Sequence, residues 1–205
     1  MHTKKLVALA ALGFAAIAIA WFIFSPQPEK YDDVAIDATS TGALSGQTYS
    51  NQDLGFEIGV PADWSADESH FSHDLGPGRE IPGVAFRIPA SFASGTNLSA
   101  DSYIAVEELS EVECAPADFL YSPGTSSAKT LGRYTYRYAT SVGAAAGNLY
   151  EQSVYATKKG NRCFALRYMI HSGNIANYPA GAVKAFDHQK LISLFDSIAA
   201  TLKIY

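Results

Sequence analysis

The apolar residues of this chain follow three successive patterns, and the first is an uninterrupted run near the N-terminus. Nineteen residues without a charge, Leu6 to Phe24, follow Lys4 and Lys5. A helix of this length spans about 28 Å at about 1.5 Å per residue, close to the roughly 30 Å hydrocarbon core of a bilayer. We therefore expect residues 6–24 to cross the lipid bilayer as a transmembrane helix whose basic end lies in the cytoplasm.

Two interpretations of this run stay open. It is either an uncleaved signal-anchor, or a signal peptide cleaved after Ala20, because Ala18 and Ala20 form an A-x-A pattern. Cleavage there would leave the apolar residues 21–24 as an exposed N-terminus, which favours the anchor. The anchor predicts a single-pass protein of the inner (cytoplasmic) membrane with an extracytoplasmic C-terminal domain. Cleavage predicts a secreted or periplasmic protein.

The second pattern is polar and has no hydrophobic periodicity. It covers residues 25–48, which contain Pro26, Pro28 and a tail rich in Ser, Thr, Gly and Ala. Such a composition is typical of a flexible linker. The sequence thus predicts a signal-anchor or signal peptide at 1–24, a linker at 25–48 and an exported domain at 49–205.

The third pattern is an alternation of apolar and polar positions, which indicates half-buried β-strands. In the first such segment, Leu54, Phe56, Ile58 and Val60 alternate with Gly and Glu until Pro61. A short helical turn is expected within 114–124. The remaining strands are predicted at 84–88, 103–109 and 130–140, and in a hairpin over 148–172 that turns at 158–161.

The end of the domain has a different period. Apolar residues recur at helical spacing, which predicts an amphipathic helix; they are Leu191, Leu194, Phe195, Ile198 and Leu202. Strands followed by one strong terminal helix indicate an α+β domain, with an antiparallel β-sheet packed against the C-terminal helix.

Two segments carry a resemblance to a known group of proteins. The opening strand "GFEIGVPADW" and the closing helix "LISLFDSIAATLKI" resemble the PsbP and Mog1-like fold, and in particular its exported bacterial members. The resemblance covers residues 49–205 and is one of pattern more than of motif. It implies an antiparallel sheet between helices that acts as a binding or accessory module. The group offers no catalytic residue to carry over.

The cysteines agree with a domain exported from the cytoplasm. Cys114 and Cys163 are the only two, and an even count in an exported domain favours a disulfide. On the chain-entropy model a bridge across this separation would stabilise the domain by about 4 kcal/mol. The alternative is two separate buried thiols. The formal net charge of −5, together with the export pattern, disfavours nucleic acid as a partner.

Candidate chemistry is sparse. His70, His73 and Asp74 lie in a polar loop, but two imidazoles without a matched third ligand do not make a specific site, so no metal and no cofactor are expected. Asn97-Leu98-Ser99 matches the N-glycosylation acceptor pattern. No nucleophile elbow or phosphate loop occurs, and we expect a protein that is not an enzyme. The alternative is a hydrolase acting on envelope material, with lids at 65–82 and 89–101.

Charges are distributed unevenly along the domain. Residues 101–118 contain six acids and no base, whereas residues 129–167 contain seven bases and one acid. Adjacent strands of opposite charge could simply pair across a ladder. The sharper hypothesis is that Arg133, Arg137 and Arg167 line an uncovered sheet face and bind a ligand or partner.

This hypothesis depends on which face the terminal helix covers. Side chains alternate along a strand, so Tyr134 and Tyr136 lie opposite Arg133 and Arg137. We expect the helix to pack on the tyrosine side, because guanidinium groups are rarely buried. The sequence therefore predicts a membrane-tethered extracytoplasmic binding or accessory module, with a protein of the cell envelope as its partner.

Overall fold

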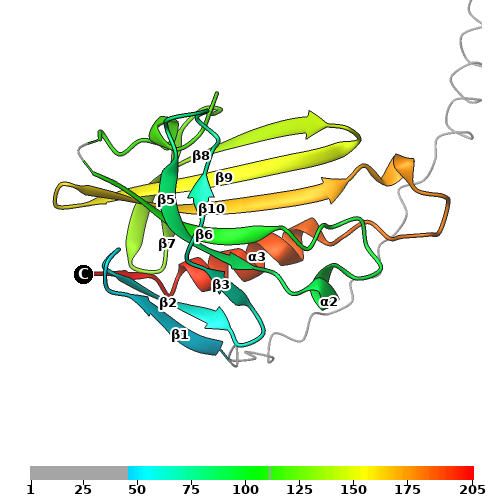
Figure 1. Ribbon diagram of the computed structural model, residues 1–205, viewed down its shortest axis with the longest axis horizontal. Coiled ribbons are helices and arrows are strands. Elements are labelled where there is room, and N and C mark those ends of the chain that lie inside the picture. The colour runs from blue at the N-terminus through cyan, green and yellow to red at the C-terminus, as the bar shows by residue number, and fades with distance from the viewer. Residues whose placement is uncertain (1–45, 111) are drawn as a thin grey trace, which may run out of the picture. The chain divides into compact units, whose positions relative to one another are not determined.

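The computed structural model of the chain describes residues 46–110 and 112–205 (Figure 1). The predicted transmembrane run at 6–24 lies outside these residues. Within the described part, no helix is both long and apolar enough to cross a bilayer. The first strand begins at Gly46, so the last three residues of the predicted linker, 46–48, are part of the folded domain.

The strands form two antiparallel sheets. The small sheet has the order β1-β2-β11, with β1 at Gly46–Asn51, β2 at Phe56–Pro61 and β11 at Lys203–Ile204. The large sheet has the order β3-β5-β6-β10-β9-β8-β7, and β4 pairs with β5 beside it. Its strands are β3 (Ser65–Asp67), β4 (Phe71–Ser72), β5 (Ile81–Arg87), β6 (Tyr103–Ser110), β7 (Ser127–Leu131), β8 (Tyr134–Ala145), β9 (Asn148–Lys159) and β10 (Arg162–Gly173).

The helices of the domain are few and mostly short. The main one, α3, runs over His188–Ala199. Asp187 caps its N-terminus, because the Asp187 carboxylate accepts a hydrogen bond of 2.9 Å from the backbone N–H of Lys190. The predicted helical turn within 114–124 is confirmed as the 3₁₀ turn η1. The short elements are α2 (Ala90–Ala93), η1 (Pro116–Asp118) and η2 (Ile175–Asn177). Strands with one long terminal helix confirm the predicted α+β class.

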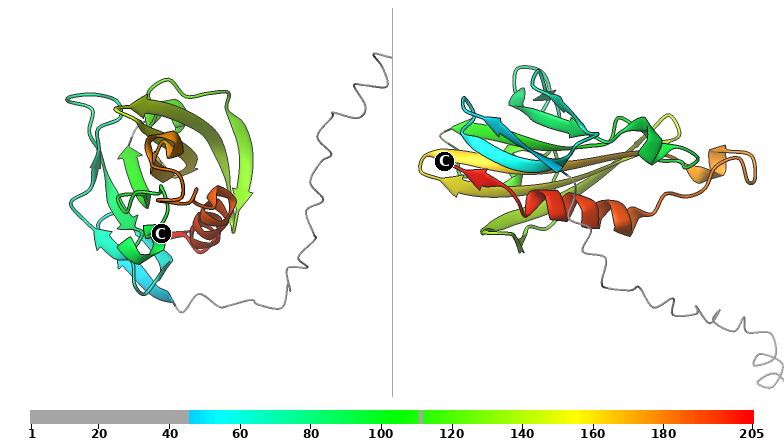
Figure 2. Two further views of the ribbon diagram at one scale, coloured as in Figure 1. Left: turned by 90° about the vertical axis from the view of Figure 1, so that its right-hand side faces the viewer. Right: turned by 90° about the horizontal axis from the view of Figure 1, so that it is seen from below.

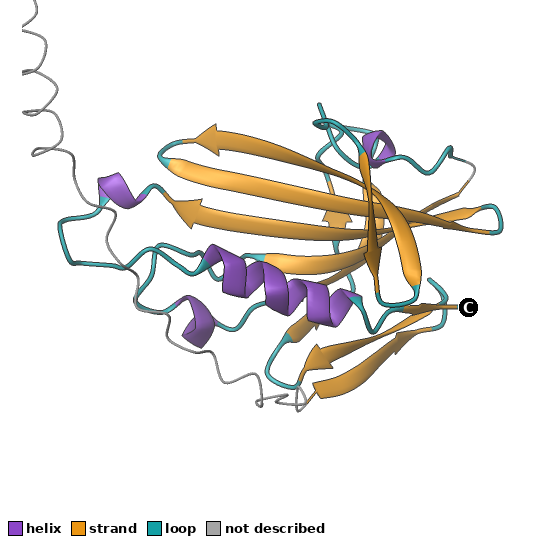
Figure 3. Ribbon diagram, turned by 180° about the vertical axis from the view of Figure 1, so that it is seen from behind, coloured by secondary structure: helices purple, strands orange, loops and turns teal. Residues whose placement is uncertain are grey.

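One face of the large sheet is covered by α3, as predicted (Figures 2 and 3). Leu191, Phe195 and Ile198 of the helix are fully buried. The ring of Phe195 lies 5.1 Å from that of Tyr168, whose hydroxyl donates a hydrogen bond of 3.0 Å to Asp196. Burial raises the pKa of Tyr168, and the nearby Asp196 carboxylate raises it further. Tyr136, Tyr155 and Tyr168 therefore belong to the core that lies between the sheet and the helix.

The predicted strand at 130–140 is in fact a hairpin. The strands β7 and β8 are joined by a turn at Gly132–Arg133, where Gly132 adopts a φ of +56°. A Cβ at this glycine would lie 2.1 Å from the carbonyl oxygen of Ala200. The turn therefore requires glycine both for its positive φ and for its lack of a side chain. A second two-residue turn, Ala146–Gly147, joins β8 to β9, and both of its residues have positive φ.

Candidate functional site

Arg167 was expected on an uncovered sheet face, and this expectation is wrong. Its side chain leaves β10 on the face opposite α3, as the strand alternation predicts, but it is 0% exposed. Its Nε and Nη2 donate hydrogen bonds of 2.7 and 3.0 Å to the Glu107 carboxylate. Nη2 also donates to the carbonyl oxygen of Phe119 at 2.7 Å, and Nη1 donates to Gln152. The guanidinium is therefore fully engaged inside the protein.

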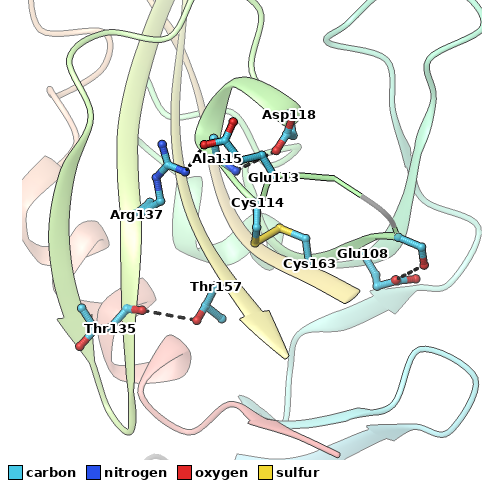
Figure 4. Close-up of a disulfide and its surroundings, with 10 residues drawn as sticks. Glu108, Glu113, Cys114, Ala115, Asp118, Thr135, Arg137, Thr157 and Cys163 are labelled. Atoms are coloured by element: carbon cyan, nitrogen blue, oxygen red, sulfur yellow. Dashed lines mark hydrogen bonds and ion pairs between the residues drawn. A yellow bond between two sulfur atoms is a disulfide. The ribbon is translucent and has the colours of Figure 1, made fainter. Parts of the chain in front are cut away.

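The second face of the sheet is covered by the segment 112–124. Phe119 and Leu120 of this segment are buried in a small core with Cys114 and Cys163. The two cysteines form the predicted disulfide, with their Cα atoms 5.2 Å apart (Figure 4). The bridge and the Arg167 contact to Phe119 together hold the segment on the sheet, which is why the arginine is enclosed.

The positive charge of Arg167 lowers the pKa of its buried partner, Glu107. Burial raises the pKa of the Glu107 carboxyl, but the Arg167 charge, its hydrogen bonds and the nearby His70 outweigh burial and leave the pKa below its ordinary value. The Nε2 atom of His70 lies 3.5 Å from the Glu107 carboxylate. Burial raises the pKa of the adjacent Tyr103 to about 12. Glu107 is therefore held as a carboxylate that supports the fold.

The loop histidines and Asp74 take separate partners. His70 is buried and its ring packs edge-on against Tyr103 at 5.1 Å, whereas His73 is exposed and lies 4.0 Å from Glu80. Asp74 accepts hydrogen bonds of 2.7 Å from Gln152 and 2.8 Å from the backbone N–H of Tyr121. Through Gln152, Asp74 joins the network of Arg167.

The other two candidate arginines are exposed but do not share a site with Arg167. Arg137 projects from β8 and pairs with Glu113 at 3.3 Å (Figure 4). Arg133 lies in the turn before β8, beyond the strand in which the sequence placed it. Acids of 101–118 thus neutralise two of the three arginines. An arginine face was expected to bind a partner only if these acids left the arginines unpaired, and two of the three are paired.

The clearest open feature of the large sheet is one side of β8. Strand β7 pairs only with Tyr134–Tyr138, and the backbone N–H of Gly124 continues the ladder by one bond, to Thr140 at 2.9 Å. Beyond this point, no strand in the described part of the chain pairs with that side of residues 141–145. In Figure 1, β8 and β9 extend well past the end of β7. We call residues 140–145 the open edge.

A hollow lies on each face of the sheet beside the open edge. The Asp74 hollow, of about 490 Å³, lies on the face opposite α3 and is lined by Asp74, Tyr121, Tyr150 and Gln152. The His188 hollow, of about 260 Å³, lies on the α3 face. Its lining includes Lys129, Tyr138, Glu151, His188 and Ile192. Ser141 and Val142 of β8 line both hollows.

Exposed apolar side chains gather at the same end of the sheet. We name two of them, Val142 and Leu149, the end cluster. Val142 and Leu149 share one face of the β8–β9 hairpin, by the register that pairs Val142 with Glu151 and Ala144 with Leu149. The segment 174–178 is held against the hairpin turn, where the backbone N–H of Asn174 donates to Gly147 at 2.9 Å. Figure 1 shows this turn at the end of the domain opposite the C-terminus.

The two segments expected to act as lids are tied to the sheet at several points. In the segment 89–101, the side chain of Asn97 donates a hydrogen bond of 2.7 Å to Gly173 and accepts one of 2.9 Å from Phe186. Leu98 forms a bridge with Ser172. In the segment 65–82, Asp74 is bonded to Gln152 as described. The Asn97 amide of the acceptor pattern thus has a structural role.

Comparisons with known proteins find similarity only at the level of structure. No protein-family model matches the chain, and no curated protein matches its sequence. A crystal structure from Bacteroides thetaiotaomicron is 14% identical, with a TM-score of 0.48. That match covers 78% of this chain and 48% of the other, so this chain spans about half of that protein's length.

Two further structures are similar over most of their own length. The solution structure of cyanobacterial PsbP from Synechocystis is 16% identical, with a TM-score of 0.44, over 81% of this chain and 96% of that one. LpqN, described as involved in cell envelope biogenesis of Mycobacterium tuberculosis, is 14% identical, with a TM-score of 0.39, over 78% and 90% of the two chains. A PsbP structure is thus among those that this chain resembles, as the sequence predicts.

The open edge and the end cluster are the site features that sequence reasoning missed. The signal available was the stretch "SVGAAAG" at 141–147, which has no charge and no proline between two strands of strong pattern. Such a stretch is typical of an unprotected strand. Of the candidate ligand-binding residues singled out from the sequence, only Asp74 lines one of the two hollows.

Proposed function

We propose that this chain is a membrane-tethered, extracytoplasmic binding or accessory module whose partner is a protein of the cell envelope. The observation that carries the proposal is the end cluster. Val142 is 68% exposed although it is an aliphatic strand residue, and Leu149 on the same face of the β8–β9 hairpin is exposed as well. Grouped apolar side chains on a surface are typical of protein interaction sites.

The proposed location has separate support. A disulfide between Cys114 and Cys163 is typical of domains that fold in an oxidising compartment. The apolar run Leu6–Phe24 supports the tether, and the two lysines before it support an orientation with the domain outside the cytoplasm. An accessory protein in this position would meet other envelope proteins along the membrane surface.

The role of the buried charged groups favours a binding module over the alternative, a hydrolase. The buried network of Arg167, Glu107 and Gln152 is directed at the backbone of the covering segment, at Phe119. These contacts support a structural role, in which the ion pair holds the segment on the sheet. The exposed features beside the network are apolar side chains and backbone groups, which suit a macromolecular partner.

Chemical cross-linking in the native membrane tests the proposal. The full-length wild-type protein should give discrete higher-mass species that contain this chain and a second protein. The double variant Val142→Ser/Leu149→Ser should lose them while its melting temperature stays close to that of the wild type. Tyr205→Ser, which removes an exposed aromatic side chain at the other end of the domain, is the matched control and should keep them. Persistence of the cross-linked species in the double variant would contradict the proposal.

A further inference from the structure

We propose that the open edge of β8 binds an extended, basic segment of the partner protein by strand addition. This inference rests on the proposed function and names the mode of binding and the chemistry of the partner. It is carried by three features that occur together: free backbone groups, a hollow on each side of them, and unbalanced acids in both hollows.

The direction of the backbone groups follows from the hairpin turns. The turn at Gly132–Arg133 makes Leu131 and Tyr134 a hydrogen-bonded pair, so the backbone groups of Tyr134 point toward β7. Alternate residues of a strand point to the same side, and the contact from Gly124 to Thr140 confirms the direction. The N–H and C=O groups of Val142 and Ala144 therefore point outward along the open edge.

The side chains of this edge leave it accessible to another strand. Exposed edges are usually protected by lysine, proline, a bulge or a covering loop. Residues 140–145 read Thr-Ser-Val-Gly-Ala-Ala, with no charge and no proline. Gly143 has open space where a Cβ would lie. An incoming strand would meet no charged or aromatic side chain along this edge.

The two hollows match the geometry of an added strand. Successive side chains of a strand point to opposite faces of the sheet. A strand paired with β8 would send alternate side chains into the Asp74 hollow and the His188 hollow, since Ser141 and Val142 line both. In strand addition, backbone hydrogen bonds supply affinity and such hollows supply specificity.

The charges in the hollows select a basic occupant. Beneath the Asp74 hollow, the buried Arg167 is neutralised by Glu107. The carboxylate of Asp74, which lines the hollow, is left in excess and accepts hydrogen bonds from uncharged donors. In the His188 hollow, Lys129 is neutralised by Asp196 at 3.0 Å. Glu151 there contacts the ring of His188 at 3.0 Å and has no lysine or arginine partner among the described residues. Each hollow therefore presents one acid.

Peptide binding to the full-length protein in neutral detergent micelles tests the inference. The probe is a fluorescein-labelled heptapeptide with two adjacent lysines, Val-Thr-Lys-Lys-Thr-Val-Thr, so that one lysine side chain faces each hollow. Fluorescence anisotropy should show saturable binding to the wild type. A peptide with glutamate in place of both lysines, and one of the same composition with its two lysines separated by one residue so that both face the same hollow, should each bind at least about tenfold more weakly.

Two proline variants test the role of the edge. Val142→Pro removes one outward N–H, and proline is tolerated at edge positions of this kind. It should weaken binding of the lysine peptide by about tenfold, the effect of one lost hydrogen bond. Val142→Ile keeps both the N–H and the apolar side chain and should bind as the wild type does. If Val142→Pro lowers the melting temperature, the same binding measurement is made on Ala144→Pro instead. This variant removes the next outward N–H of the edge.

Several results would overturn the inference. Equal binding of the three peptides, absence of saturable binding, or wild-type affinity in a folded proline variant would each exclude a basic strand at this edge. Loss of a dimer in Val142→Pro without an effect on peptide binding would identify a second copy of the chain as the occupant instead. Cross-linking through the end cluster is measured separately, so strand addition can fail while the proposed function holds, and the reverse.

Discussion

Arg167 on β10 and Glu107 on β6 form a fully buried ion pair across neighbouring strands. Both side chains are 0% exposed, and the guanidinium donates two hydrogen bonds to the carboxylate. The pair lies diagonally across the ladder that joins Arg167 to Ala105 and Ala165 to Glu107. Since the same guanidinium also binds the carbonyl oxygen of Phe119, it couples the sheet to the segment that covers it.

Removal of one partner of this pair should strongly destabilise the domain. Arg167→Met leaves Glu107 buried without a counter-charge, which should cost about 3–5 kcal/mol of unfolding free energy. Urea denaturation of the wild type and the variant measures the difference. Arg137→Gln is the matched control, because it removes an exposed ion pair worth about 1 kcal/mol or less. Equal effects of the two substitutions would contradict the structural role of Arg167.

The same pair predicts a loss of stability in acid. The folded-state pKa of Glu107 is lowered, so its contribution is fully present above the ordinary value of 4.5 and is lost as the pH falls through the folded-state pKa. Urea unfolding between about pH 7 and pH 3 should show a steeper decline below about pH 4.5 in the wild type than in Glu107→Gln. Parallel curves would show that Glu107 does not titrate in this way.

The disulfide should stabilise the domain independently of the ion pair. Cys114 and Cys163 are 49 residues apart, and a closed loop of this size is worth about 4 kcal/mol on the chain-entropy model. Cys163→Ser should therefore melt well below the wild type. A reducing agent should lower the melting temperature of the wild type and leave that of the Cys114→Ser/Cys163→Ser variant unchanged. A reductant effect on the double variant would point to a cause other than this bridge.

The exposed arginines should matter little for either stability or binding. Arg133 lies in a turn, and Arg137 is paired with Glu113 on the surface. Arg133→Gln/Arg137→Gln should change the unfolding free energy by about 1 kcal/mol or less. It should also leave the cross-linked species of the native membrane intact. Loss of these species without a change in melting temperature would restore the arginine face as the binding site.

Elements with a clear hydrophobic period were predictable from the sequence. The alternation in 54–60 predicts β2, whose Phe56 and Ile58 are fully buried, although Leu54 itself lies in the preceding turn. The helical spacing at the end of the chain predicts α3 and the sheet side it covers. Both predictions use only local periodicity and the avoidance of buried charge, and both are confirmed.

The burial of Arg167 depends on contacts that local patterns do not encode. Alternation correctly places Arg167 on the side of the sheet away from α3. The cover on that side is the segment 112–124, which has no periodic pattern and is held by the Cys114–Cys163 bridge and by Arg167 itself. The β7–β8 turn was missed for a different reason: Gly132–Arg133 interrupts one long run of strand-forming residues, and only the glycine marks it.

The open edge depends on the order of strands in the sheet. Position at an edge is decided by which strands pair, and β6 pairs with β10 across more than fifty residues of sequence. No local pattern reports such a pairing. The small, uncharged residues of 140–145 were visible in the sequence. That they form an open edge is known only from the structure, in which β7 pairs with β8 no further than Tyr138.

The most direct test of the central claim is site-specific photo-cross-linking in the native membrane. A photoreactive amino acid is placed at Leu149, in the end cluster, or at Tyr205, which is exposed at the opposite end of the domain. The account predicts a discrete protein adduct from position 149 and none of the same mass from position 205. Identical adducts from both positions, or no protein adduct from position 149, would contradict a partner-binding site at the β8–β9 end of the sheet.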